Sequence, residues 1–95
     1  KKEDANKAYN LSGRFVVSLP KPSYPVDDEG IVVVKITVDK NGKVASAEPG
    51  VEGTTTSNKI LWSESKKAAL KAIFNIDENA SDLQQGTITY RFILD

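Results

Sequence analysis

Every second residue is apolar in two stretches of this chain, one near its middle and one near its end. In the first stretch, 31–38, the evenly spaced apolar positions are Val32, Val34, Ile36 and Val38. In the second, 87–94, they are Ile88, Tyr90, Phe92 and Leu94. Successive side chains of a β-strand point to opposite faces, so this spacing predicts two strands that each bury one face.

A hairpin and a return strand follow the first of these strands. Residues 39–43 contain Asn41-Gly42, a pair that tolerates the positive φ angles of tight hairpin turns. We therefore expect residues 44–48 to run back beside 31–38. The dipeptide Pro49-Gly50 is a turn signal and ends the return strand.

Helical spacing occurs between the return strand and the last strand. A narrow stripe of mostly small side chains recurs there, at Leu61, Ser65, Ala68 and Ala72. Ser57 or Asn58 is the expected N-cap, because both side chains accept hydrogen bonds from the free N–H groups of a helix start. Trp62, Leu70 and Phe74 lie off the stripe, either as a partner-facing patch or, for Phe74, folded under the helix end.

These elements predict an α+β fold, in which a three-stranded antiparallel or mixed sheet carries one helix packed on one face. The hairpin makes strands 31–38 and 44–48 neighbours. A right-handed crossover through the helix then places strand 87–94 on the other side of 31–38. Numbered along the chain, the strands lie in the order 2-1-3, so the last strand is an edge of the sheet.

Two segments precede the first strand. Residues 1–13 are polar, so we expect them to be a flexible linker end and the folded domain to occupy 14–95. Residues 14–19 form at most a short strand. Prolines at 20, 22 and 25 exclude a helix, and they predict a stiff extended strap over the surface, anchored by Tyr24.

Composition removes several classes of function. The 95 residues include no His and no Cys, which excludes a Ser-His-Asp triad, a thiolate nucleophile and a zinc finger. Thirteen basic residues balance thirteen acidic ones, so the formal net charge of 0 argues against binding of nucleic acid. Ser63-Glu64-Ser65-Lys66 matches the S-x-x-K motif by chance, since its companion motifs are missing. We expect no enzymatic activity, no cofactor and no metal.

The last strand is the best candidate for a binding site. It contains no Pro and a single charge, Arg91, so it has few of the devices that shield exposed edges. Such an edge accepts an extra strand from a partner through main-chain hydrogen bonds. The predicted partner-binding residues are Thr87, Ile88, Thr89, Tyr90, Arg91, Phe92, Ile93 and Leu94, with Tyr24 and Pro25 bracing the neighbouring surface.

Alternatively, another segment of the same chain could cover this edge. The segment 14–19 has the alternation of a short strand and is long enough to cover part of a sheet edge. In that case it would act as an internal competitor that a partner must displace.

The order of several motifs resembles the C-terminal domain of TonB-type energy transducers, in its Bacteroides-type branch. The matching motifs are Pro22-Ser23-Tyr24-Pro25, residues 30–39, Asn41-Gly42-Lys43-Val44, the Ala-rich helix with Leu61, and residues 86–94. The resemblance extends from about Gly13 to Leu94.

The resemblance implies a non-enzymatic periplasmic module, tethered to the inner membrane by a helix outside this sequence. It implies that the module grips the TonB box, a peptide segment of outer-membrane TonB-dependent transporters. Inner-membrane motor proteins, reached through the missing N-terminal region, would supply proton-driven work for nutrient uptake. A monomer or weak homodimer is expected.

Two other functions are compatible with the same elements. A TonB-like domain attached to a membrane sensor or peptidase would recognise envelope ligands without transmitting force. A small protease inhibitor would instead display a hairpin loop, and residues 49–57 would then be the segment that enters the protease.

Overall fold

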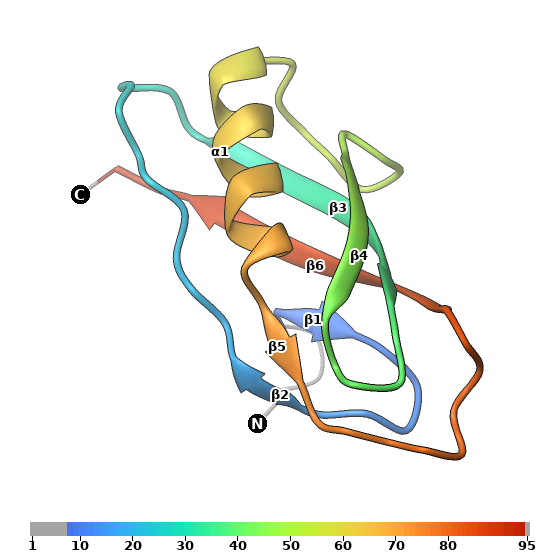
Figure 1. The fold of residues 1–95 in the computed structure, drawn as a ribbon. Helices are drawn as coiled ribbons and strands as arrows, with labels where there is room; N and C mark the ends of the chain where they lie inside the picture. The colour runs from blue at the N-terminus through green and yellow to red at the C-terminus, as the bar shows by residue number, and fades with distance from the viewer. Residues whose placement is uncertain (1–7, 95) are drawn as a thin grey trace, which may run out of the picture.

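The computed structural model describes residues 8–94, in which an antiparallel sheet carries one α-helix on one face (Figure 1). The predicted α+β class is confirmed. The strands are β1 (Tyr9–Asn10), β2 (Val16–Ser18), β3 (Gly30–Val38), β4 (Val44–Pro49), β5 (Ile73–Phe74) and β6 (Gln84–Phe92), and the helix is α1 (Lys59–Leu70).

The main sheet has four strands in the order β1-β6-β3-β4, and all its neighbours are antiparallel. The predicted order 2-1-3 corresponds to β4-β3-β6 and is correct, but the count of three strands is wrong because β1 adds a fourth. The longest ladder joins β3 to β6, from Gly30 opposite Phe92 to Val38 opposite Gln84. Strand β6 therefore begins three residues earlier than predicted.

The core lies between the sheet and α1. One face of the sheet contributes Val32, Val34, Ile36, Val38, Ile88, Tyr90 and Phe92, all buried. The helix contributes the predicted stripe of Leu61, Ser65 and Ala68 together with Ala69, and Ala72 follows it. Because most of these helix side chains are small, α1 packs closely on β3 and β4.

The turn between β3 and β4 depends on Asp39 and Gly42. The carboxylate of Asp39 accepts hydrogen bonds from the N–H groups of Asn41 and Lys43, both at 2.9 Å. Gly42 has a φ of 87°, and a side chain there would collide with the carbonyl oxygen of Phe74. Glycine is thus required both by the turn and by the close approach of β5.

The helix begins after Asn58, one of the two predicted caps. The side chain of Asn58 accepts a hydrogen bond from the N–H of Ile60 at 2.9 Å. Trp62 covers Gly50 and donates from its indole nitrogen to the carbonyl oxygen of Thr56 at 2.7 Å, so it holds the 50–56 loop. Phe74 is buried under the helix end, whereas Leu70 is exposed.

Residues 14–19 do not reach an edge of the main sheet. Strand β2 pairs instead with β5 in a separate two-stranded sheet, Val16 lying opposite Phe74. The role of internal edge cover predicted for 14–19 is therefore wrong. The residues that follow the helix, Ile73–Phe74, pair with β2 instead.

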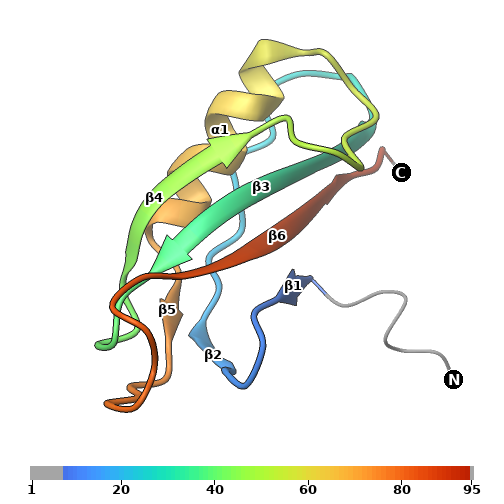
Figure 2. The same ribbon diagram turned by 90° about the vertical axis from the view of Figure 1, so that its right-hand side faces the viewer.

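The chain differs from the predicted linker over residues 8–13. Tyr9–Asn10 form β1 on the outer side of β6, and Leu11 is buried in the core (Figure 2). The ring of Tyr9 packs edge-on against that of Phe74, with 5.7 Å between the ring centroids. The remaining linker residues, 1–7, lie outside the described residues.

Candidate functional site

The outer side of β6 is defined by the alternation of its backbone groups. The N–H of Thr89 donates to the carbonyl oxygen of Ala8 at 2.7 Å, so the backbone groups of Thr89 face away from β3. Backbone groups two residues apart in a strand point to the same side. Those of Thr87 and Arg91 therefore also point outward, while those of Ile88, Tyr90 and Phe92 pair with β3.

The first half of this outer side is already occupied. Tyr9 lies opposite Ile88 and Asn10 lies opposite Thr87 in the antiparallel register of β1 and β6. The prediction that the whole of 87–94 presents an open edge is thus wrong for residues 87–89. Sequence alternation did not reveal β1, because its ordered contacts are few and its partner lies far along the chain.

The second half of the outer side is open in the part of the chain that the structure describes. No residue from 8 to 94 hydrogen-bonds to the backbone N–H or C=O of Arg91 on that side. Beyond the end of β6, the N–H of Leu94 donates to a carboxylate oxygen of Glu29 at 2.7 Å. The free stretch is therefore short and centred on Arg91.

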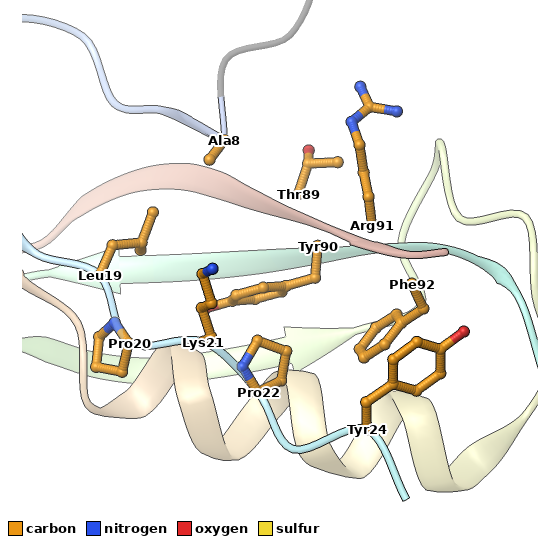
Figure 3. A pocket seen from close by; sticks show the side chains of 10 residues that line it. All are labelled: Ala8, Leu19, Pro20, Lys21, Pro22, Tyr24, Thr89, Tyr90, Arg91 and Phe92. Carbon is orange, nitrogen blue, oxygen red and sulfur yellow. The ribbon is translucent and has the colours of Figure 1, made fainter. Parts of the chain in front are cut away.

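A pocket of about 510 Å³ lies against this open half (Figure 3). Its lining comes from the strap, from β6 and from the end of β1: Leu19, Pro20, Lys21, Pro22, Tyr24, Thr89, Tyr90, Arg91, Phe92 and Ala8. Most of these side chains are apolar or aromatic. The volume is within the range of pockets that bind small ligands or side chains.

The pocket reaches the backbone of the edge itself. Figure 3 shows the side chains of Tyr90 and Phe92 on the strap side of β6 and those of Thr89 and Arg91 on the opposite side. Thr89 and Arg91 nevertheless line the pocket. Because residues with side chains on both faces of β6 line it, the pocket reaches the edge of the strand, where the backbone groups of Arg91 point outward.

The strap forms the second wall because Tyr24 holds it against β6. The rings of Tyr24 and Phe92 meet edge-on with centroids 5.1 Å apart, and the Tyr24 hydroxyl donates to the carbonyl oxygen of Asp28 at 2.8 Å. Partial burial, together with the charges of Glu29, Asp28 and Asp27, raises the pKa of Tyr24 above its ordinary value. The predicted anchoring role of Tyr24 is confirmed.

Tyr90 lies at the floor of the pocket with a buried hydroxyl. That hydroxyl has no hydrogen-bond partner within residues 8–94. Burial raises the pKa of Tyr90 to about 12, because the tyrosinate form would lose its hydration. The phenol is thus neutral at all physiological pH values.

The predicted partner-binding residues divide into three groups. Tyr24, Thr89, Tyr90, Arg91 and Phe92 meet at the pocket. Thr87 and Ile88 are covered by β1, which pairs with them. The other three, Pro25, Ile93 and Leu94, are exposed and do not line it.

Sequence reasoning missed the contribution of the strap's own side chains. Leu19, Pro20, Lys21 and Pro22 face β6 across the pocket. The spacing of the prolines predicted an extended strap. Nothing in that pattern indicated which strand the strap lies beside.

Other candidate chemistry is not supported by the geometry. The 50–56 loop is bonded along β3, since Gly50 donates to the Val33 carbonyl at 3.0 Å and Thr55 donates to the Ile31 carbonyl at 2.8 Å. These bonds hold the two ends of the 50–56 loop against β3. Over residues 8–94 no cluster of His, Cys, Asp and Glu side chains could hold a metal ion.

Comparison of the chain with protein-family models, with curated proteins and with solved structures finds no match in any of the three. Among the helices of the described chain, none has the length and apolar character needed to cross a membrane.

Proposed function

We propose that this chain is a non-enzymatic binding module that takes up an extended peptide as an added strand on the outer side of β6. The observation that carries the proposal is that, among residues 8–94, none bonds to the outward backbone groups of Arg91, which lie beside a largely apolar pocket. Main-chain hydrogen bonds supply affinity in this mode, and pockets for alternate side chains supply specificity.

The resemblance of the sequence to TonB-type C-terminal domains suggests the source of the peptide. We propose that it is the TonB box of an outer-membrane transporter, and that the module acts in the periplasm, tethered to the inner membrane. In that role the added strand would transmit force from a proton-driven motor to the transporter. Strand addition suits such a load, because a pull along the added strand is shared by all of its backbone hydrogen bonds to the edge.

The test is loss of peptide binding when the outward N–H of Arg91 is removed. Arg91→Pro deletes this donor, and Arg91→Ala removes the guanidinium but keeps the donor. Calorimetry with synthetic TonB-box peptides should show affinity reduced about tenfold more by Arg91→Pro than by Arg91→Ala, as expected for a lost bond and a disturbed ladder.

The opposite edge of the sheet provides the matched control. Glu48 and Ser46 lie opposite Lys35 and Thr37, whose backbone groups face β4, so Ala47 between them points its N–H outward from β4. Ala47→Pro therefore removes an equivalent donor from the other edge. Retained binding in Ala47→Pro supports the β6 site, whereas loss in Ala47→Pro with retention in Arg91→Pro assigns the peptide to β4 instead.

A further inference from the structure

We infer that the pocket beside β6 selects a partner strand in which an acidic residue stands between two large apolar residues. This inference rests on the proposed addition of a strand to β6 and specifies the chemistry of that strand. The pattern follows from which face each position of an added strand would occupy.

An added strand that continues along the β6 edge presents alternate side chains to opposite faces of the sheet. Positions beside Tyr90 and Phe92 share the strap-side face with these two residues, and so their side chains enter the pocket (Figure 3). The walls there are mainly the rings and aliphatic side chains of Leu19, Pro22 and Tyr24, and Lys21 is the one charged side chain that the strap adds to them. Two apolar side chains, two positions apart, are the occupants that such walls bind best.

In the added strand, the position between those beside Tyr90 and Phe92 lies beside Arg91, and its side chain is on the other face of the sheet. The guanidinium of Arg91 is exposed there, and Figure 3 shows it projecting away from the pocket. Glu29 lines the neighbouring hollow, but its carboxylate already accepts the hydrogen bond from Leu94. An acidic side chain in the partner strand therefore complements Arg91. Because the pattern is symmetrical, it applies to either strand direction.

The N-terminal residues of this chain have the wrong chemistry for the pocket. The seven residues before Ala8 contain one apolar side chain, Ala5, among Lys, Glu, Asp and Asn. They cannot supply two large apolar groups. The proposed occupant is therefore a partner strand rather than this N-terminal segment.

The experiment uses short synthetic peptides on a Thr-rich background that differ only in three central residues. The sequences are Leu-Glu-Leu, Ser-Glu-Ser and Leu-Lys-Leu. Calorimetry measures affinity for the full chain, and amide NMR shifts locate each peptide by its effect on Arg91. We expect Leu-Glu-Leu to bind about tenfold more tightly than Ser-Glu-Ser through apolar burial. Its advantage over Leu-Lys-Leu is expected to be about threefold, as for an exposed ion pair.

The outcomes separate this inference from the proposed function. Peptides that shift the Arg91 amide with equal affinities leave strand addition intact and overturn the selected pattern. If no peptide perturbs the β6 edge, both the strand addition and the pattern fail. Tight binding of Leu-Glu-Leu with shifts on β4 rather than β6 also overturns both.

Two variants test the roles of the walls and of the charge. Leu19→Ser should shrink the preference for Leu over Ser, with folding verified by circular dichroism. Arg91→Glu should reverse the preference, so that Leu-Lys-Leu binds better than Leu-Glu-Leu. Lys66→Glu makes the same charge change at an exposed site on α1 and should leave the preference unaltered. An unaltered preference in Arg91→Glu would contradict the assigned role of Arg91.

Discussion

The hydroxyl of Tyr90 is buried without a hydrogen-bond partner in residues 8–94, at a position where the ring itself is needed for the core and the pocket floor. A buried hydroxyl that bonds to nothing loses its hydration and gains no compensating contact. Tyr90 therefore contributes to stability through its ring, while its hydroxyl is neutral or unfavourable.

This arrangement predicts a specific loss of stability in alkali. The pKa of Tyr90 is raised from 10.0 to about 12 in the folded chain by burial. Between these pH values the unfolded chain releases the proton and the folded chain keeps it, so the free energy of unfolding falls as pH rises. Tyr90→Phe should remove much of this decline and preserve stability at neutral pH. Urea unfolding of both proteins across this pH interval measures the effect.

Tyr24→Phe is the control for that measurement. Its hydroxyl is exposed and bonds to the Asp28 carbonyl at the surface, so its removal should change the alkaline decline less than Tyr90→Phe does. An equal effect of the two substitutions would show that burial of the Tyr90 phenol is not the cause.

At the scale of elements, β1 and an incoming strand share one edge. Strand β1 lies opposite Thr87 and Ile88, and the carbonyl oxygen of Ala8 accepts a hydrogen bond from the N–H of Thr89. A partner strand that extends past Arg91 toward these residues must displace β1. We therefore expect residues 8–10, rather than 14–19, to compete with a partner strand for this edge.

Removal of residues 1–10 should tighten peptide binding by about five- to tenfold, because one or two additional backbone bonds become available to the partner. Calorimetry with the same synthetic peptides measures this gain. Removal of residues 1–7 alone leaves β1 in place and serves as the matched control, with unchanged affinity expected. Weaker or unchanged binding after removal of 1–10 would mean that β1 does not compete.

The elements that sequence predicted well are those with local patterns. Alternation fixed the buried faces of β3 and β6, and the residue types of Asn41-Gly42 and Asn58 located the turn and the helix cap. The missed elements, β1 and β5, are two residues long and owe their existence to partners distant in the chain. For the same reason sequence suggested residues 14–19 as a possible cover of the edge, whereas the structure places β1 there.

Over the whole molecule, three regions distant in sequence are joined by the buried side chain of Arg14. Its guanidinium donates to the carbonyl of Asn75 after β5, to the carbonyl of Asp39 at 3.1 Å and to the amide oxygen of Gln84 at 3.1 Å. Arg14 is 6% exposed, and residues 8–94 place no carboxylate in an ion pair with it. Sequence gave no indication of this role, since surface exposure is the usual state of arginine.

Arg14→Lys should therefore destabilise the fold although it preserves the charge. A single ammonium cannot reach three acceptors that diverge around a planar guanidinium, so at least one buried oxygen loses its donor. We expect the free energy of unfolding to fall by about 2–3 kcal/mol, measured by urea titration with the fluorescence of Trp62. Arg91→Lys makes the same change at an exposed position and should alter stability by less than about 0.5 kcal/mol. Equal stabilities of the two variants would contradict the joining role of Arg14, because the acceptors that surround it would then be satisfied by other groups.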